Sequence, residues 1–175
     1  MNKDFELVGT TNPVLITPCK EFDFLSPPFE PIEFSHKMIK FMYDSKGIGM
    51  AANQVGVPYR VFCMRGEPEN FVCFNPRVVG SSSEEIELEE GCLSYPNFYV
   101  KIKRPRHVRV RFQTPNGDTL TKQFTGMTAR IFQHELDHLN GKRFFDSLSK
   151  LKIEMAMKKA IKRGSKYTML NFVKG

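Results

Sequence analysis

The chain has 175 residues, of which 41% are apolar and 26% charged, and these values predict one globular domain with a hydrophobic core. No apolar run approaches the roughly 20 residues that a membrane helix needs, and the N-terminus lacks the basic and apolar segments of a signal peptide. We therefore expect a cytoplasmic protein that does not enter a membrane. The four cysteines are then expected to be free thiols or metal ligands rather than disulfides.

The net charge of +7 is concentrated at the C-terminus. Residues 1–149 carry as many acids as bases, whereas residues 150–175 carry eight Lys or Arg against one Glu. This distribution indicates a neutral body with a basic tail.

The first 30 residues are rich in proline and have no regular periodicity, which favours irregular structure. Residues 31–43 show the apolar spacing of a helix behind a proline suited to its first turn. Apolar or alternating runs then predict three strands, at residues 60–64, 71–74 and 84–90.

The clearest local pattern is a hairpin in the second half of the chain. Apolar and polar residues alternate over residues 107–114, Asn116-Gly117 forms a favourable turn, and the chain returns over residues 119–124.

Two helices are predicted after this hairpin. One covers residues 126–139 and is stopped by Asn140-Gly141, and the other covers residues 148–163. The whole pattern predicts a single α+β domain over residues 1–175, with antiparallel strands around a central helix and a basic C-terminal helix and tail from about residue 148.

The central helix carries His134-Glu135-Leu136-Asp137-His138, an H-E-x-x-H motif. Residues four apart on a helix share one face, so both imidazoles can bind one cation. Glu135 lies beside the pair, where its carboxylate can take a proton from water on the metal. The motif therefore predicts a metal site and favours hydrolysis over a surface helix with two titrating histidines.

The motif alone does not identify the third metal ligand. A metalloprotease continuation fails because Phe144 occupies its last ligand position, and Glu154 lies in the basic tail, where pairing with a neighbouring lysine is expected. His36, His107 and the cysteines remain. Cys92, in the segment E-G-C-L-S, suits Zn²⁺ or Fe²⁺ beside two imidazoles, and the alternative is a buried cysteine that acts as a small hydrophobe.

Residues 47–54, Gly-Ile-Gly-Met-Ala-Ala-Asn-Gln, are dense in small residues but match neither a P-loop nor a dinucleotide fingerprint. Such a segment suits close approach of the backbone to a ligand or a strand. Gln54 offers a side-chain amide to a developing oxyanion.

Together, these segments resemble the three signature motifs of the peptide deformylase family. Residues 47–54 match G-x-G-x-A-A-x-Q, residues 90–94 match E-G-C-L-S and residues 133–138 match Q-H-E-x-D-H, in the family's order and without a mismatch. The resemblance extends over about residues 36–150. It implies a metal-dependent hydrolase of protein biosynthesis that removes the formyl group from N-formylmethionyl nascent polypeptides, giving formate and a free N-terminal methionine.

By this resemblance Cys92, His134 and His138 hold one divalent metal ion, which is ferrous iron in the cell and replaceable by Zn²⁺, Ni²⁺ or Co²⁺. Glu135 takes a proton from the attacking water and passes one to the leaving amine.

The same resemblance implies that the backbone N–H of Leu93 and the amide of Gln54 hold the oxyanion together with the metal. The substrate is expected to lie extended along the backbone, with its methionine in an apolar pocket whose rim includes the stem of Arg130. The residues expected to bind it are Ile48, Gly49, Gly91, Met127 and Ile131.

The basic tail resembles the lysine-rich C-terminal helix with which some deformylases dock on the ribosome, and its charge fits contacts with RNA phosphate. The alternative is a solubilising helix. The sequence departs from the family at Asn97, where glycine is common, and in the N-terminal element.

Two rival functions share parts of this pattern. A metallopeptidase uses the same H-E-x-x-H chemistry but lacks its usual ligand after His138. A nucleic-acid-binding module with a structural metal would suit the basic tail, but the neutral body and the general base beside the ligands argue against it.

Overall fold

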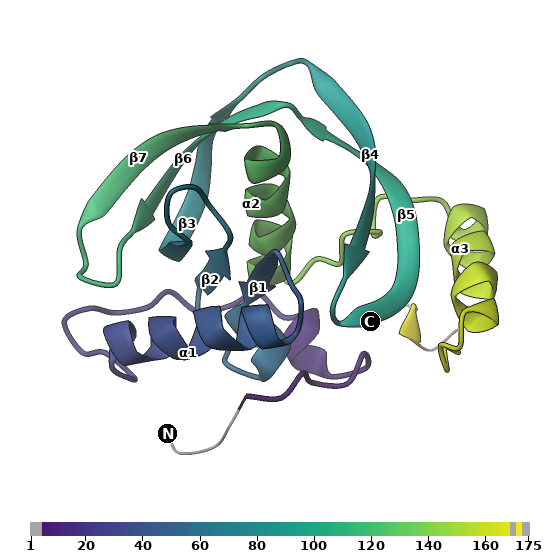
Figure 1. Cartoon of the computed structure of the whole chain (residues 1–175), viewed down its shortest axis with the longest axis horizontal. Helices are drawn as coiled ribbons and strands as arrows, with labels where there is room; N and C mark the ends of the chain where they lie inside the picture. The colour runs from purple at the N-terminus through teal and green to yellow at the C-terminus, as the bar shows by residue number, and fades with distance from the viewer. Residues whose placement is uncertain (1–4, 169–170, 173–175) are drawn as a thin grey trace.

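The computed structural model describes residues 5–168 and 171–172. Over these residues, two antiparallel sheets and the central helix α2 form the body, with α1 and α3 on its outside (Figure 1). This architecture confirms the predicted α+β fold. In the described part of the chain, no helix combines the length and the apolar character that crossing a bilayer requires.

The larger sheet has five antiparallel strands in the order β1-β2-β3-β6-β7. The strands span Gly49–Ala51 (β1), Val61–Met64 (β2), Phe71–Ser81 (β3), His107–Gln113 (β6) and Thr119–Thr125 (β7). The β6–β7 hairpin has the predicted turn, in which Gly117 adopts a φ of 88°. β3 is longer than its apolar run predicts, because its second half is exposed and is held by pairing with β6.

The smaller sheet is a hairpin of β4 (Glu85–Cys92) and β5 (Tyr95–Pro105). Opposite charges face each other across the two strands on the exposed face, because Glu87 pairs with Lys103 and Glu89 pairs with Lys101. β5 lies outside the elements predicted from the sequence. It forms because its alternate residues are buried against the C-terminal region while β4 supplies its hydrogen-bonding edge.

Helix α2 (Gly126–Leu139) has the predicted bounds. Gly126 and Gly141 take positive φ values of 58° and 67° at its two ends, a conformation that costs glycine little. Phe132 is fully buried between Phe62 of β2 and Phe124 of β7, with ring centroids 5.1 and 5.8 Å away. Burial of such a side chain stabilises the fold by about 2–3 kcal/mol, so this contact fixes the helix on the sheet.

The two outer helices are α1 (Pro31–Asp44) and α3 (Lys150–Lys162), close to their predicted ranges. α3 packs on β5 through Ala156, Met157 and Ala160. Two further apolar residues of this helix, Leu151 and Met155, are exposed.

Candidate active site

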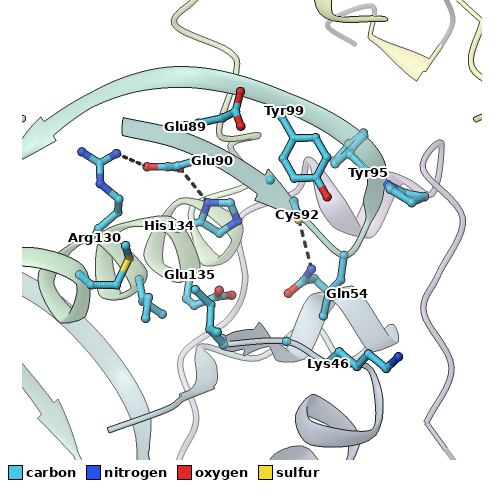
Figure 2. Close-up of a pocket in the computed structure, with 18 of the residues that line it drawn as sticks. Lys46, Gln54, Glu89, Glu90, Cys92, Tyr95, Tyr99, Arg130, His134 and Glu135 are labelled. Carbon is cyan, nitrogen blue, oxygen red and sulfur yellow. Dashed lines mark hydrogen bonds and ion pairs between the residues drawn. The ribbon is translucent and has the colours of Figure 1, made fainter. Parts of the chain in front are cut away.

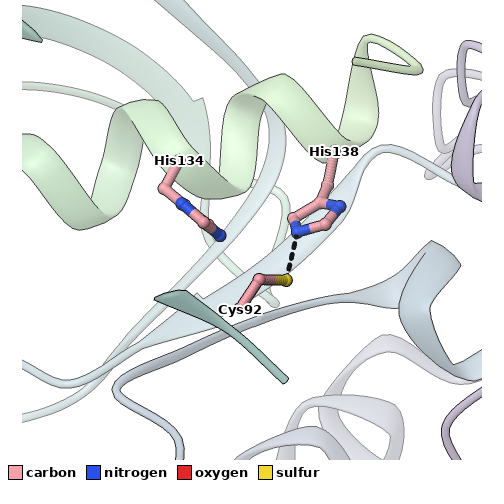
Figure 3. Close-up of side chains that lie close together, drawn as sticks. All are labelled: Cys92, His134 and His138. Atoms are coloured by element: carbon pink, nitrogen blue, oxygen red, sulfur yellow. Dashed lines mark hydrogen bonds between the residues drawn. The ribbon is translucent and has the colours of Figure 1, made fainter. Parts of the chain in front are cut away.

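His134 and His138 lie one turn apart on α2 and point toward the end of β4, where Cys92 meets them (Figure 3). The Sγ of Cys92 is 3.2 Å from the Nε2 of His138, and the three potential ligand atoms lie within 4.8 Å of one another. Tetrahedral ligands about 2.0–2.3 Å from one ion are roughly 3.5 Å apart. The donor set and its spacing therefore fit a divalent transition metal.

The end of β4 is shaped to place the thiol there. The strand register shifts between Glu90 and Cys92, where β4 pairs with β5. A Cβ on Gly91 would lie only 2.5 Å from the Tyr99 ring, so this position requires glycine. Glycine here lets the Tyr99 ring approach the strand closely just before Cys92.

The three candidate ligands also interact electrostatically. Burial opposes charge on Cys92, but the two imidazoles lower the pKa of its thiol to about 5. Burial likewise opposes charge on His134, yet its hydrogen bonds to Cys92 and Glu90 raise its pKa to about 10. A thiolate is thus already favoured at neutral pH, which is the form that binds a metal.

Glu90 anchors His134 from behind (Figure 2). Its Oε2 lies 3.0 Å from the Nδ1 of His134, which leaves the Nε2 of the ring free to face Cys92. Arg104 donates to both oxygens of Glu90 at 2.6 and 3.0 Å, and Arg130 donates to Oε1 at 2.6 Å. Burial opposes ionisation, but the bonds to His134 and Arg104 lower the pKa of Glu90 to about 2.

This buried network was not predicted beyond the motif that contains Glu90. Arg130 lines the cavity, but its guanidinium is buried against Glu90 and also donates to the carbonyls of Ile102 and Ile86. The stem of Arg130, predicted to form part of the pocket rim, thus belongs to a side chain whose guanidinium also supports Glu90. The sequence signal that could have predicted this support was an acid, Glu90, directly before Gly91-Cys92. A metal-bound histidine needs an acceptor for its second ring nitrogen.

Glu135 is buried beside the ligands, and its side chain is directed at β1. A Cβ on Gly49 would lie 2.3 Å from its Oε1, so the glycine makes room for the carboxylate. Its Oε2 has no hydrogen-bond partner among the described residues. Burial raises the pKa of Glu135 to about 7.

Gln54 lies in the short 3-10 helix η2 (Ala52–Val55) after β1. Its Oε1 accepts from the backbone N of Ala51 at 2.9 Å, and its Nε2 donates to Ser94 Oγ at 3.0 Å and to Cys92 Sγ at 3.4 Å. The amide is therefore oriented with its donor toward the metal ligands. Leu93 lies in the β4–β5 turn and lines the same cavity.

The cavity in front of these groups has a volume of about 500 Å³, within the range of small-molecule sites. Five further residues predicted to contact substrate line it: Ile48, Gly49, Gly91, Met127 and Ile131. Ile131 is buried, whereas Ile48 and Met127 are about half exposed.

The other candidates for metal ligands lie elsewhere. Cys19, Cys63 and Cys73 are buried in the hydrophobic core, as expected for them. His36 lies on α1 and His107 begins β6, and neither lines the cavity.

Comparisons with known proteins agree with this geometry. Residues 5–154 match the model of the family described as polypeptide deformylase. The chain is 39% identical to a peptide deformylase of Rhodopseudomonas palustris over 88% of this chain and 97% of that protein. It is 41% identical to one of Bradyrhizobium diazoefficiens over 83% and 92%, respectively.

Solved structures show the same likeness. A crystal structure of a peptide deformylase from Legionella pneumophila superposes with a TM-score of 0.83 at 33% identity, covering 92% of this chain and 95% of that one. The chain therefore belongs to the peptide deformylase family, and it is a metal-dependent deformylase whose Cys–His–His metal site is formed by Cys92, His134 and His138.

Proposed function

We propose that Glu135, Gln54 and Leu93 carry out deformylation of N-formylmethionyl polypeptides in the cavity in front of the metal site. The observation that carries this proposal is that the buried Glu135 carboxylate lines the same cavity as the ligands Cys92 and His134, with the third ligand, His138, 3.2 Å from the Cys92 sulfur. A divalent cation held there supplies a Lewis acid that activates water and polarises the formyl carbonyl.

Glu135 acts as general base and then as general acid. Its carboxylate takes one proton as water attacks the formyl carbon, and it delivers that proton to the amine nitrogen as the C–N bond breaks. The products are formate and a free N-terminal methionine. Burial holds the pKa of Glu135 near 7, which suits a group that both accepts and returns a proton near neutral pH.

Gln54 and Leu93 stabilise the negative charge that develops on the formyl oxygen. The Nε2 of Gln54 is already aimed at Cys92, 3.4 Å away, and its Oε1 is held by the backbone N–H of Ala51. A donor fixed in this way costs little reorganisation during the reaction. The backbone N–H of Leu93 is the second donor, since its turn immediately follows Cys92.

Binding of the peptide uses backbone pairing and one apolar pocket. Gly49 and Gly91 present the main chain without side chains on two walls of the cavity, which suits an extended peptide added as a strand, and Ile48 flanks that path. Met127 and Ile131 come from one face of α2 and provide an apolar surface for the methionine side chain. Backbone pairing accepts many sequences after that residue.

Fe²⁺ is the proposed native ion, with Zn²⁺, Ni²⁺ or Co²⁺ as substitutes. One thiolate and two imidazoles suit all four ions. Metal analysis after anaerobic purification identifies the native ion, and zinc alone in that sample would overturn the assignment to iron.

Formate release from formyl-Met-Ala-Ser by the iron-loaded protein tests the proposed chemistry under anaerobic conditions. We expect formate from the wild type and a loss of at least about 10²-fold in Glu135→Gln, with the metal content unchanged. Release of amino acids without formate would support the metallopeptidase alternative instead.

The basic C-terminal region, from about residue 148, is proposed to dock the single catalytic domain on the ribosome in the cytoplasm. Most lysines of α3 are exposed, and Leu151 and Met155 add exposed apolar surface beside them. Phosphate contacts of this kind weaken steeply with salt. Co-sedimentation with ribosomes over a salt series tests this proposal, and binding that is insensitive to salt would contradict it.

A further inference from the structure

One wall of the active-site cavity is formed by the first residues of β5. Pro96, Asn97 and Tyr99 line the cavity there, opposite the wall formed by α2. In Figure 2, Tyr95 and Tyr99 stand on the other side of Cys92 and His134 from Arg130. We call residues 96–99 the β5 rim. None of the proposed catalytic steps uses it.

The β5 rim is hydrogen-bonded to the chain that follows α3. Asn97 Nδ2 donates to the carbonyl of Arg163 and to Ser165 Oγ, both at 3.3 Å. Ser165 Oγ donates to the carbonyl of Pro96 at 2.8 Å, and Tyr167 OH donates to the same carbonyl at 2.6 Å. Four bonds thus join two segments that are almost 70 residues apart in the sequence.

Asn97 is the rim residue whose side chain bonds to this C-terminal segment, residues 163–167. Its backbone adopts a φ of 63°, a left-handed conformation that asparagine tolerates better than most residues. Glycine would adopt the same backbone without strain but would lack the amide that bonds to Arg163 and Ser165. The side chain of Asn97 therefore adds a contact that the backbone conformation alone does not require.

Side-chain packing continues the link toward the metal site. The guanidinium of Arg163 lies 5.6 Å from the centroid of the Tyr99 ring, and this ring occupies the space that a Cβ on Gly91 would need. Gly91 directly precedes the ligand Cys92. On the other side, the Tyr167 ring lies edge-on to Phe98, with centroids 6.3 Å apart, so the segment is packed as well as hydrogen-bonded.

We propose that Asn97, Ser165 and Tyr167 are positioning residues, which hold the β5 rim in the shape that receives the part of the peptide after the formylmethionine. This inference rests on the proposed peptide orientation, in which α2 receives the methionine side chain. The rim, on the facing wall, is then available only to residues that follow. If residues 163–167 no longer hold the rim, each substrate must order the rim when it binds. The free-energy cost of that ordering falls on substrate binding rather than on the chemical step.

Kinetics on two substrates test this inference with the full-length, iron-loaded protein. The variant Asn97→Gly/Ser165→Ala/Tyr167→Phe removes all four hydrogen bonds, while it keeps the left-handed backbone and the aromatic packing. Lys166→Ala is the matched control, because Lys166 lies between the two bonding residues and is exposed. Formyl-Met-Ala-Ser reaches beyond the first residue, and formyl-methioninamide does not.

We expect KM for formyl-Met-Ala-Ser to rise about fivefold in the triple variant, the effect of ordering about one additional side chain on binding, with kcat within twofold of the wild type. KM for formyl-methioninamide and both parameters of Lys166→Ala should not change. Asn97→Gly alone should show the same pattern at smaller size, which covers the case of a triple variant that folds poorly.

An equal change in KM for the two substrates, or a loss confined to kcat, would overturn the positioning role. Formate release by the wild-type protein is measured first. If the wild type releases no formate, the proposed function fails; if it does, the comparison of KM values tests the positioning role alone.

Discussion

The contact between Gly49 and Glu135 makes a sharp prediction about catalysis. Gly49→Ala is expected to abolish most activity although it adds one methyl group and changes no reacting atom. The new Cβ would lie 2.3 Å from Oε1 and 2.8 Å from Cδ of Glu135, and 2.9 Å from a methyl group of Ile131. These positions lie well inside ordinary van der Waals contact, so a neighbour must move.

The magnitude follows from how far the carboxylate must withdraw. A displacement of roughly 1 Å restores a normal contact, and a misplacement of this size at a catalytic group costs about 10²-fold in rate. Withdrawal of β1 instead is opposed because its other two residues, Met50 and Ala51, are fully buried. Overpacking of this kind also lowers the free energy of unfolding by about 1–3 kcal/mol.

Formate release, metal content and thermal unfolding measured together separate these effects. Gly49→Ala should keep its metal, because the atoms that clash are not ligand atoms, and it should lose activity at temperatures where it remains folded. Gly9→Ala is the control, since a Cβ there would meet nothing within 4 Å. Wild-type kcat/KM in folded Gly49→Ala would refute the role assigned to the position of Glu135.

Glu90→Gln should weaken metal binding by about 10- to 100-fold in chelator competition, because the charged acceptor behind His134 is lost; an unchanged dissociation constant would exclude Glu90 from support of the site. Gln54→Ala should lower kcat by about 10²–10³ with KM little changed, and a loss confined to KM would instead assign Gln54 to substrate binding. In metal-free protein, Cys92 should be alkylated at a rate that is nearly constant from about pH 6 to 8 and falls below its pKa of about 5. Cys19, whose pKa burial raises to about 11, should remain unlabelled over that range; mass spectrometry of the labelled peptides compares the two, and equal labelling would contradict the assignment.

Several features of this protein were determined by short stretches of sequence. The helix that carries H-E-x-x-H begins and ends at the predicted residues, because its glycines and its apolar period are local signals. The Asn116-Gly117 turn likewise produced the predicted hairpin. The spacing of the two histidines was enough to predict that they share one face of a helix.

Other features depend on residues that no local period connects. Cys92 is 46 residues from His138 in the chain, and chemistry alone left it between a ligand and a core residue until the family resemblance favoured the ligand. Tertiary structure brings the end of β4 to α2 by pairing β4 with β5, a strand that the sequence pattern did not predict.

The buried support of the site was also decided only in three dimensions. The pKa of Glu90 is low inside the protein because His134 of α2 and Arg104 of β5 bond to its carboxylate despite burial, and the β5 rim depends on a segment beyond α3. Periodicity reports which face of an element is apolar, whereas such contacts arise from how distant elements pack. The sequence therefore determined which side chains are candidates for the chemistry, and the tertiary structure determined what holds them in place.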